Sequence, residues 1–520
     1  MSAIEPLSGT RAAAGHADPG RLIAKALYSR NTAFVLLAIA LLQQSLGHHN
    51  GDNSWLFTVA ERLLSGARPY ADVLETNPPG AFLIYMPAAW VARLMGLPIE
   101  LVASTTIFLG TLGLLVHLRS GLLRSGVLAP SDSHFFLNAG VFALLVLPGF
   151  SFGEREHLAS IAVLPMLCLY GRRAAGDRPS LSEIALAGLL AGLAVIAKPH
   201  FAAAIALPLM WLAVQQRSMR PLFAVEHWIA AAPVVIYLAS LPLVFPAFFD
   251  RLPSIVEVYV PIRTPFSLLL TKPWFLVNLT LIGTVILAGR RFGIPALARF
   301  CLLGSAGFAL AYVVQAKGWV NHGLPGVSLA FLAAAITVGP ALREFLDVGP
   351  ESQLWQAQRR PLLFVLLPAL ISAPILFGTI IQFSGWEEYE GLTSAVRRLG
   401  PPHPKLAAVS AELDVGHPLV RRVEGVWSMR PHSLWQMTCA LMLLQRGNAG
   451  PELTQRLKAY VDEDAHNFRE DMERNQPDLI IVDGSGAIGQ VLRNPDVVAG
   501  LKDYRPVESV AHLMIWKRSH

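Results

Sequence analysis

Long apolar runs recur through the first three quarters of this chain, and they constrain its fold more than any other feature. An α-helix rises 1.5 Å per residue, so a run of about 20 residues crosses the ~30 Å hydrocarbon core of a bilayer. Of the 520 residues, 53% are hydrophobic and 15% are charged, which is more apolar surface than one soluble core can hide. The sequence therefore predicts a mostly α-helical, polytopic membrane protein. The runs lie near residues 33 to 47, 99 to 118, 135 to 150, 157 to 171, 181 to 197, 199 to 216, 227 to 248, 271 to 289, 296 to 315, 323 to 341 and 361 to 383.

A further segment, near 80 to 95, decides on which side of the membrane every later loop lies. It is short and is interrupted by Pro87. If it crosses, five basic loops fall outside; if it lies along the outer interface or dips in and returns, the same loops fall inside with the N-terminus. Cytoplasmic loops retain Lys and Arg, so we adopt the second count. It predicts about eleven transmembrane helices in residues 33–383, a cytoplasmic tail at 1–32 and an outward-facing C-terminus. The five loops carry "HLRSGLLRSG", "GRRAAGDR", "QQRSMR", "GRRFG" and "AQRR".

Residues 384–520 have the composition of a soluble domain. Stretches of alternating or continuous apolar residues predict strands at 405–413, 477–484 and 512–518, and a charged helical pattern spans 452–474. The apolar run at 434–444 is too short to span a bilayer and suits a core helix of this domain. We expect a small α/β domain on the outer side of the membrane.

The loops assigned to the outer side contain nearly all of the unusual ionisable residues. Charges at the ends of membrane spans are costly unless they pair with each other or line a polar cavity. The presence of these ionisable residues on one side of the membrane therefore suggests a functional site there. The segments concerned are 48–98, 150–157, 198–200, 249–270 and 315–325.

The first of these loops begins "GHHNGDNSWLF", and its apolar residues predict an amphipathic helix at the membrane surface. Asp52 or Asn53 lies where a helix N-cap belongs, and the alternative role for Asp52 is that of a positioned general base. The two histidines and Asp52 could also hold a divalent metal, although adjacent histidines on a regular helix do not readily face one ion; a divalent metal is possible and no other cofactor is indicated. The three cysteines, Cys168, Cys301 and Cys439, are too far apart to indicate a disulfide framework or a zinc cluster.

An Asp just after the first span, a surface helix and then "G.RPYADVLETNPPG" resemble the first periplasmic loop of the GT-C glycosyltransferases. The resemblance is to the bacterial relatives of the protein O-mannosyltransferases and to the lipid A aminoarabinose transferases. It implies a bacterial inner-membrane enzyme that takes a sugar from a polyprenyl-phosphate carrier at a periplasmic site. The acceptor would be an envelope lipid, polysaccharide or protein, and no nucleic acid is involved. The resemblance maps the catalytic Asp onto Asp52; Asn53 stands where many members carry a second acid.

Sugar transfer requires a base for the acceptor proton and cations for the departing phosphate, and the outer loops offer both. We assign Asp52 as the base and give catalytic roles to Glu154 and Glu156, with Arg155 pairing to one of these glutamates. The same charges could simply form a solvated loop. Glu75 could be a second carboxylate near Asp52 or could hydrogen-bond the turn before "NPP". The residues assigned to substrate binding are Asp72, Glu75, Arg155, Lys198, His200, Arg263, Lys317 and His322.

The basic residues in that set are the candidate phosphate ligands, because preorganised cations stabilise the charge that develops on a leaving phosphate. We rank Lys198, Arg263 and Lys317 first, and His200 and His322 after them. Snorkelling toward the interface is the alternative explanation for any one lysine. Two other functions also need charges near a membrane. A lipid-linked-sugar transporter or flippase would be expected to show broken helices or repeated halves, which the sequence lacks. A polysaccharide ligase or polymerase is less consistent with the acidic first loop.

Overall fold

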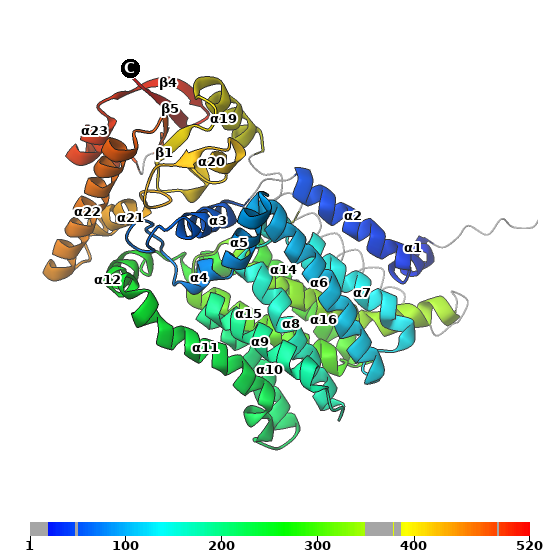
Figure 1. The fold of residues 1–520 in the computed structure, drawn as a ribbon. Coiled ribbons are helices and arrows are strands. Elements are labelled where there is room, and N and C mark those ends of the chain that lie inside the picture. The colour runs from blue at the N-terminus through cyan, green and yellow to red at the C-terminus, as the bar shows by residue number, and fades with distance from the viewer. Residues whose placement is uncertain (1–18, 47–49, 349–377, 379–385, 486–487, 520) are drawn as a thin grey trace, which may run out of the picture.

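The computed structural model describes residues 19–46, 50–348, 378, 386–485 and 488–519. The chain is mostly helical, with a small sheet near its C-terminus, as predicted. Most of the expected run at 361–383, and His48 and His49, lie outside the described residues. Figure 1 shows a bundle of helices with the C-terminal domain seated on one end of it.

Five helices in the described part of the chain are long and apolar enough to cross a membrane. They are α6 (Ile99–Arg124), α11 (Val225–Val244), α14 (Pro273–Phe292), α15 (Ala296–Gln315) and the segment Val320–Glu344 of α16 (Val320–Val348). The other helices of this part are shorter or carry charges. They are α1 (Pro19–Leu27), α2 (Arg30–Leu46), α3 (Gly51–Leu64), α4 (Gly80–Leu83), α5 (Met86–Met95), α7 (Ser133–Val141), α8 (Arg155–Ala174), α9 (Leu181–Ala197), α10 (Ala203–Gln215), α12 (Pro246–Ser254) and α13 (Phe266–Leu270).

Arginines of two predicted cytoplasmic loops bind acids at the starts of α9 and α11, at one end of the bundle. Glu183 binds both Arg124 (2.9 Å) and Arg172 (2.7 Å), and Arg173 binds Glu226 (2.8 Å). The loops after α6, α8 and α10 therefore meet. Both topology counts place these loops on one shared side of the membrane, so the arrangement is compatible with either, and the orientation stays a prediction.

The segment near 80 to 95 does not run from one end of the bundle to the other. Arg421 of the C-terminal domain binds Glu61 of α3 and Glu100 at the start of α6, so the chain before and after the segment lies at the same end. Within the segment, α4 ends at Leu83 and α5 begins at Met86 with Pro87 in its first turn. Proline lacks an N–H and favours the start of a helix over its interior, which explains the break.

The C-terminal domain is a five-stranded sheet in the order β2-β1-β3-β5-β4. β1 pairs in parallel with β2 and β3, whereas β5 is antiparallel to β3 and β4. The predicted strands, the charged helix and the core helix at 434–444 are all present, and β2 and β4 were not predicted. The elements are α19 (Trp386–Leu399), β1 (Lys405–Val409), α20 (Leu419–Arg422), β2 (Val426–Trp427), α21 (Trp435–Arg446), α22 (Pro451–Asn475), β3 (Leu479–Asp483), α23 (Pro495–Leu501), β4 (Tyr504–Val510) and β5 (Leu513–Arg518).

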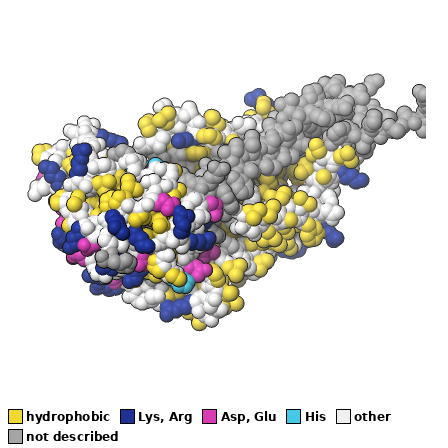
Figure 2. Space-filling model, turned by 90° about the horizontal axis from the view of Figure 1, so that it is seen from above, with side chains coloured by type: hydrophobic (Ala, Val, Ile, Leu, Met, Phe, Trp, Pro, Cys, Tyr) yellow, Lys and Arg dark blue, Asp and Glu magenta, His cyan; other side chains and the backbone are white. Residues whose placement is uncertain are grey.

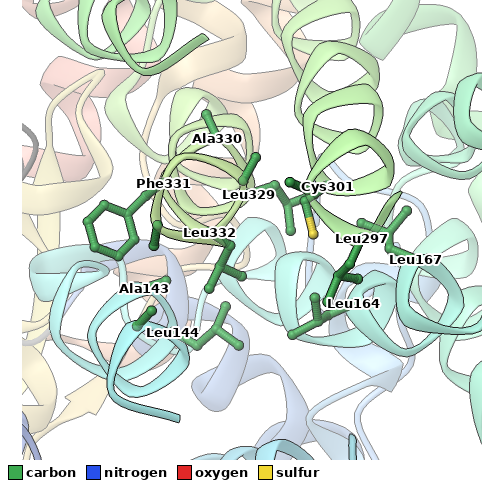
Figure 3. Packing of buried hydrophobic residues seen from close by; sticks show 14 of the residues in the cluster. Ala143, Leu144, Leu164, Leu167, Leu297, Cys301, Leu329, Ala330, Phe331 and Leu332 are labelled. Carbon is green, nitrogen blue, oxygen red and sulfur yellow. The ribbon is translucent and has the colours of Figure 1, made fainter. Parts of the chain in front are cut away.

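Two large hydrophobic cores, with a small third cluster around Tyr312, hold the described part of the molecule together. In the first, leucines of the π-helical turn η2 (Phe142–Val146), α8, α15 and α16 interlock with Cys301, as Figure 3 shows. The second core joins the C-terminal sheet to Trp55, Leu56 and Phe57 of α3. The helix α3 was expected to lie on the membrane surface; instead the domain covers it, because its apolar residues pack against the domain as well as against α5. Figure 2 looks down on this domain and shows acidic and basic side chains interspersed with apolar patches.

Candidate functional site

The site begins at the first turn of α3, which places Asp52. The side chain of Asn50 accepts a hydrogen bond from the N–H of Asn53 (3.0 Å), so Asn50 is the N-cap. The alternative in which Asp52 or Asn53 caps the helix is therefore wrong. Asp52 keeps its carboxylate for another partner, Arg155, whose Nη2 lies 3.3 Å from Asp52 Oδ2.

The pairing of Arg155 differs from the prediction, which gave it a glutamate partner. Glu154, Arg155 and Glu156 are consecutive at the start of α8, and neighbouring residues on a helix point in different directions. Glu154 accepts a hydrogen bond from the side chain of Asn50. Glu156 faces Lys198 instead. Glu154 and Arg155 thus contact the start of α3, Glu156 contacts the turn after α9, and none of the three pairs with its neighbour.

Glu156, Lys198 and His322 form a buried triad between α8, α16 and the turn after α9. The Lys198 ammonium bonds to the Glu156 carboxylate and lies 3.4 Å from His322 Nε2, which is itself 3.4 Å from Glu156 Oε1. Glu156 has no exposed side-chain surface, and 12% of the Lys198 side chain is exposed. Charges this deep persist only when they pair or serve a polar cavity, so the triad is a functional candidate.

Several buried polar atoms of this cluster have no hydrogen-bond partner within the described residues. They are Glu154 Oε2, Arg155 Nη1, Glu156 Oε2, His200 Nε2 and His322 Nδ1. A buried polar atom without a partner costs free energy comparable to a lost hydrogen bond. These atoms are therefore well suited to bind a polar ligand. Burial, together with the charges of Asp52 and Glu156, also raises the pKa of Glu154 well above its usual value, so Glu154 holds a proton readily.

Lys317 and Arg263 form a second basic group beside the triad. The Lys317 ammonium donates to the carbonyls of Tyr259 and Ile262, each at 2.6 Å, and lies over the Tyr259 ring. Burial lowers the pKa of Lys317 to about 8. Arg263 is exposed and donates to the carbonyl of Val260. Trp319 connects the two groups, because its ring contacts both Tyr259 and His322.

Asp72 and Glu75 have structural partners in the first loop. Arg68 holds Asp72 on the surface at 3.1 Å, and this hydrogen bond lowers the pKa of Asp72 to about 2. Glu75 is buried, accepts the Trp55 indole N–H, and accepts the backbone N–H groups of Thr76 and Asn77. The alternative in which Glu75 orders the turn before "NPP" is thus the one that the geometry favours.

Sequence reasoning missed the residues that position the acidic loop. The Tyr85 hydroxyl donates to the Gly153 carbonyl (2.8 Å) and to Asn53 Oδ1 (3.1 Å), and the Asn53 amide donates to the Phe152 carbonyl. These bonds tie α3 to the turn that carries Glu154. A polar Tyr in the apolar run at 80–95 was the available signal. Across the ranges described above, no group of three or more His, Cys, Asp or Glu residues could hold a metal ion.

The chain thus combines an apolar helical bundle, a buried charged cluster at one end of it and a small α/β domain seated on that end, and a solved structure has a similar fold. The chain is similar over 93% of its length to ArnT from Cupriavidus metallidurans, a lipid A aminoarabinose transferase solved in the apo state. The TM-score is 0.50, the match covers 96% of ArnT, and the sequences are 12% identical. The likeness shows the fold that the first loop predicted. No family model and no curated protein matches the sequence.

Proposed function

We propose that this protein transfers a sugar from a polyprenyl-phosphate carrier to an acceptor of the cell envelope, at the periplasmic face of the inner membrane. The observation that carries the proposal is the convergence of Asp52, Arg155, Glu156, Lys198 and His322 from four separate segments. The pairs Asp52–Arg155 and Glu156–Lys198 combine a reachable carboxylate with buried cations. The fold shared with ArnT supports the same reaction class.

Asp52 would take the acceptor proton. About 32% of its side chain is exposed, whereas only 5% of the Arg155 side chain is, so a buried guanidinium holds an accessible carboxylate in place. As the acceptor oxygen bonds to the anomeric carbon, its proton passes to the carboxylate. The bond from that carbon to the carrier phosphate breaks, and its electron pair leaves on the phosphate. In-line attack with inversion is the stereochemistry that this reaction class implies.

The phosphate of the carrier would bind the cations that line the same end of the bundle. Lys198 and His322 lie beside the carboxylates, and Lys317 with Arg263 would receive the lipid phosphate at the edge of the site. Lys317 has two of its N–H groups on backbone carbonyls, which leaves one for a ligand. Preorganised cations stabilise charge that develops on a leaving phosphate monoester.

The experiment compares wild type with Asp52→Asn in membranes supplied with polyprenyl-phosphate-linked sugar. Mass spectrometry of envelope lipids, polysaccharides and proteins, with and without the gene, identifies sugar and acceptor. Asp52→Asn should reduce transfer by at least about a hundredfold, the range for loss of a general base. Asp462→Asn, an exposed aspartate on α22, is the matched control. Near-normal transfer by Asp52→Asn would refute the assignment of the base.

A further inference from the structure

A carboxylate of the C-terminal domain lies directly against the start of α3. A Cβ atom built on Gly51 would come within 2.0 Å of Asp414 Oδ1 and 2.8 Å of the His417 carbonyl oxygen. These distances are far shorter than any real contact, so only glycine at position 51 allows the domain to approach this closely. The residue that follows Gly51 is Asp52. The fold therefore brings Asp414 of the C-terminal domain against the residue that precedes Asp52.

The fold of the domain explains why Asp414 faces the site. Asp414 lies in a 3₁₀ turn, Leu413–Val415, that follows β1. β1 and β3 are parallel, and their carboxyl ends are joined by the hydrogen bond from Ser410 to Asp483. Open α/β sheets bind ligands beyond the carboxyl ends of their parallel strands. This edge of the sheet lies against the start of α3.

The charges of the two aspartates are coupled. The pKa of Asp414 is raised to about 7, first because protein surrounds the carboxyl and then because Asp52 and Glu412 add negative charge nearby. Asp414 is nevertheless an exposed residue, so a ligand can reach it. Arg155 Nη2 lies 3.3 Å from the Asp52 carboxylate and holds it in place. Asp414 therefore takes up a proton as the pH falls through about 7.

We propose that Asp414 and Asp52 form an acid pair that binds the hydroxyl group of the acceptor, so that the C-terminal domain supplies one of the residues of the transfer site. The proposal rests on the transferase function given above. The acceptor oxygen forms the new bond to the anomeric carbon while its proton passes to the ionised pair. The bond to the carrier phosphate breaks and its electron pair stays on the phosphate, so no further reactant is needed.

The test measures the pH dependence of sugar transfer by full-length protein in membranes. Wild type should lose activity as the pH falls through about 7, because Asp414 is then protonated and its carboxylate no longer accepts the hydrogen bond of the acceptor hydroxyl. Asp414→Asn should lower kcat at least tenfold and move this acid limb at least one pH unit lower, since the carboxyl group that titrates near pH 7 is removed. Asp414→Glu should restore part of kcat and should move the acid limb of the pH profile back toward its wild-type position. Asp503→Asn, an exposed aspartate of the same domain, is the matched control and should resemble wild type.

Gly51→Ala provides a second, independent perturbation. It leaves both carboxylates in the chain but displaces Asp414, so its pH profile should follow that of Asp414→Asn. An unchanged kcat and acid limb in Asp414→Asn, alongside an inactive Asp52→Asn, would overturn the acid pair and leave the transferase intact. A rate that falls without rescue by Glu and without movement of the limb would also overturn it, because that pattern indicates a structural role. Absence of transfer by wild type would instead refute the proposed function itself.

Discussion

The buried pair Glu156–Lys198 allows the sharpest test of how the charged cluster is held. Glu156 has no exposed surface and Lys198 has 12%, so removing either partner leaves an uncompensated charge inside the bundle. Breaking a buried pair in this way costs about 3 to 5 kcal/mol. The stability loss caused by Lys198→Met should lie at the lower end of this range, because the positive charge of Arg155 still stabilises the Glu156 carboxylate. Glu156→Gln should fall at the upper end, because Lys198 then faces Arg155 without a carboxylate between them.

The double variant Glu156→Gln with Lys198→Met separates pairing from packing. Removal of both charges by groups of similar volume is close to neutral for stability, so the double variant should lose about 1 kcal/mol or less. The coupling free energy of the cycle should therefore exceed about 3 kcal/mol. The assay is denaturant unfolding of the purified protein in detergent micelles, with linear extrapolation of the free energy of unfolding.

The exposed pair Arg68–Asp72 is the matched control for this cycle. Its side chains are 77% and 41% exposed, and an exposed ion pair contributes at most about 1 kcal/mol. Coupling in the control should therefore stay below that value. Two outcomes would refute the argument that the cluster is a buried, mutually compensated unit. In the first, each single variant at positions 156 and 198 loses less than about 1 kcal/mol of stability. In the second, the stability loss of the double variant equals the sum of the losses of the two single variants.

Two further predictions concern the bundle. Gly307→Ala should destabilise the protein by about 1 to 3 kcal/mol, because the new methyl group would lie 2.4 Å from the Ala203 carbonyl oxygen of α10. Gly113→Ala is the control, and it should be neutral or mildly stabilising because nothing lies within 4 Å of the new methyl group. Equal effects of the two variants on the free energy of unfolding would contradict this account of helix packing. Reporter fusions after Arg124 and after Arg173 should both report the cytoplasm, since their loops meet at one end of the bundle, and a periplasmic readout from both would reverse the proposed orientation.

The sequence predicted the elements of this fold better than the contacts between them. Apolar runs and strand patterns depend on local residues, so the helical bundle and strands β1, β3 and β5 could be located in advance. The gathering of acids and cations at one end followed from the distribution of Lys and Arg among the loops. The partner of Arg155 could not be predicted, because it depends on how α8 is rotated against α3. The same is true of Glu75, whose partner Trp55 lies on another element.

Asp414 shows most clearly where sequence reasoning ends. It follows a strand in a turn where aspartate is common, and more than 360 residues separate it from Asp52. No spacing rule connects two positions so far apart in the chain. The available signal was Gly51, but a glycine beside a helix start has many explanations, and only the approach of Asp414 makes its missing side chain necessary. The helix α3 is therefore shaped by the domain that covers it. If the acid pair operates as proposed, the C-terminal domain does more than cover the site, because it brings the acceptor to a carboxylate that the membrane bundle alone does not contain.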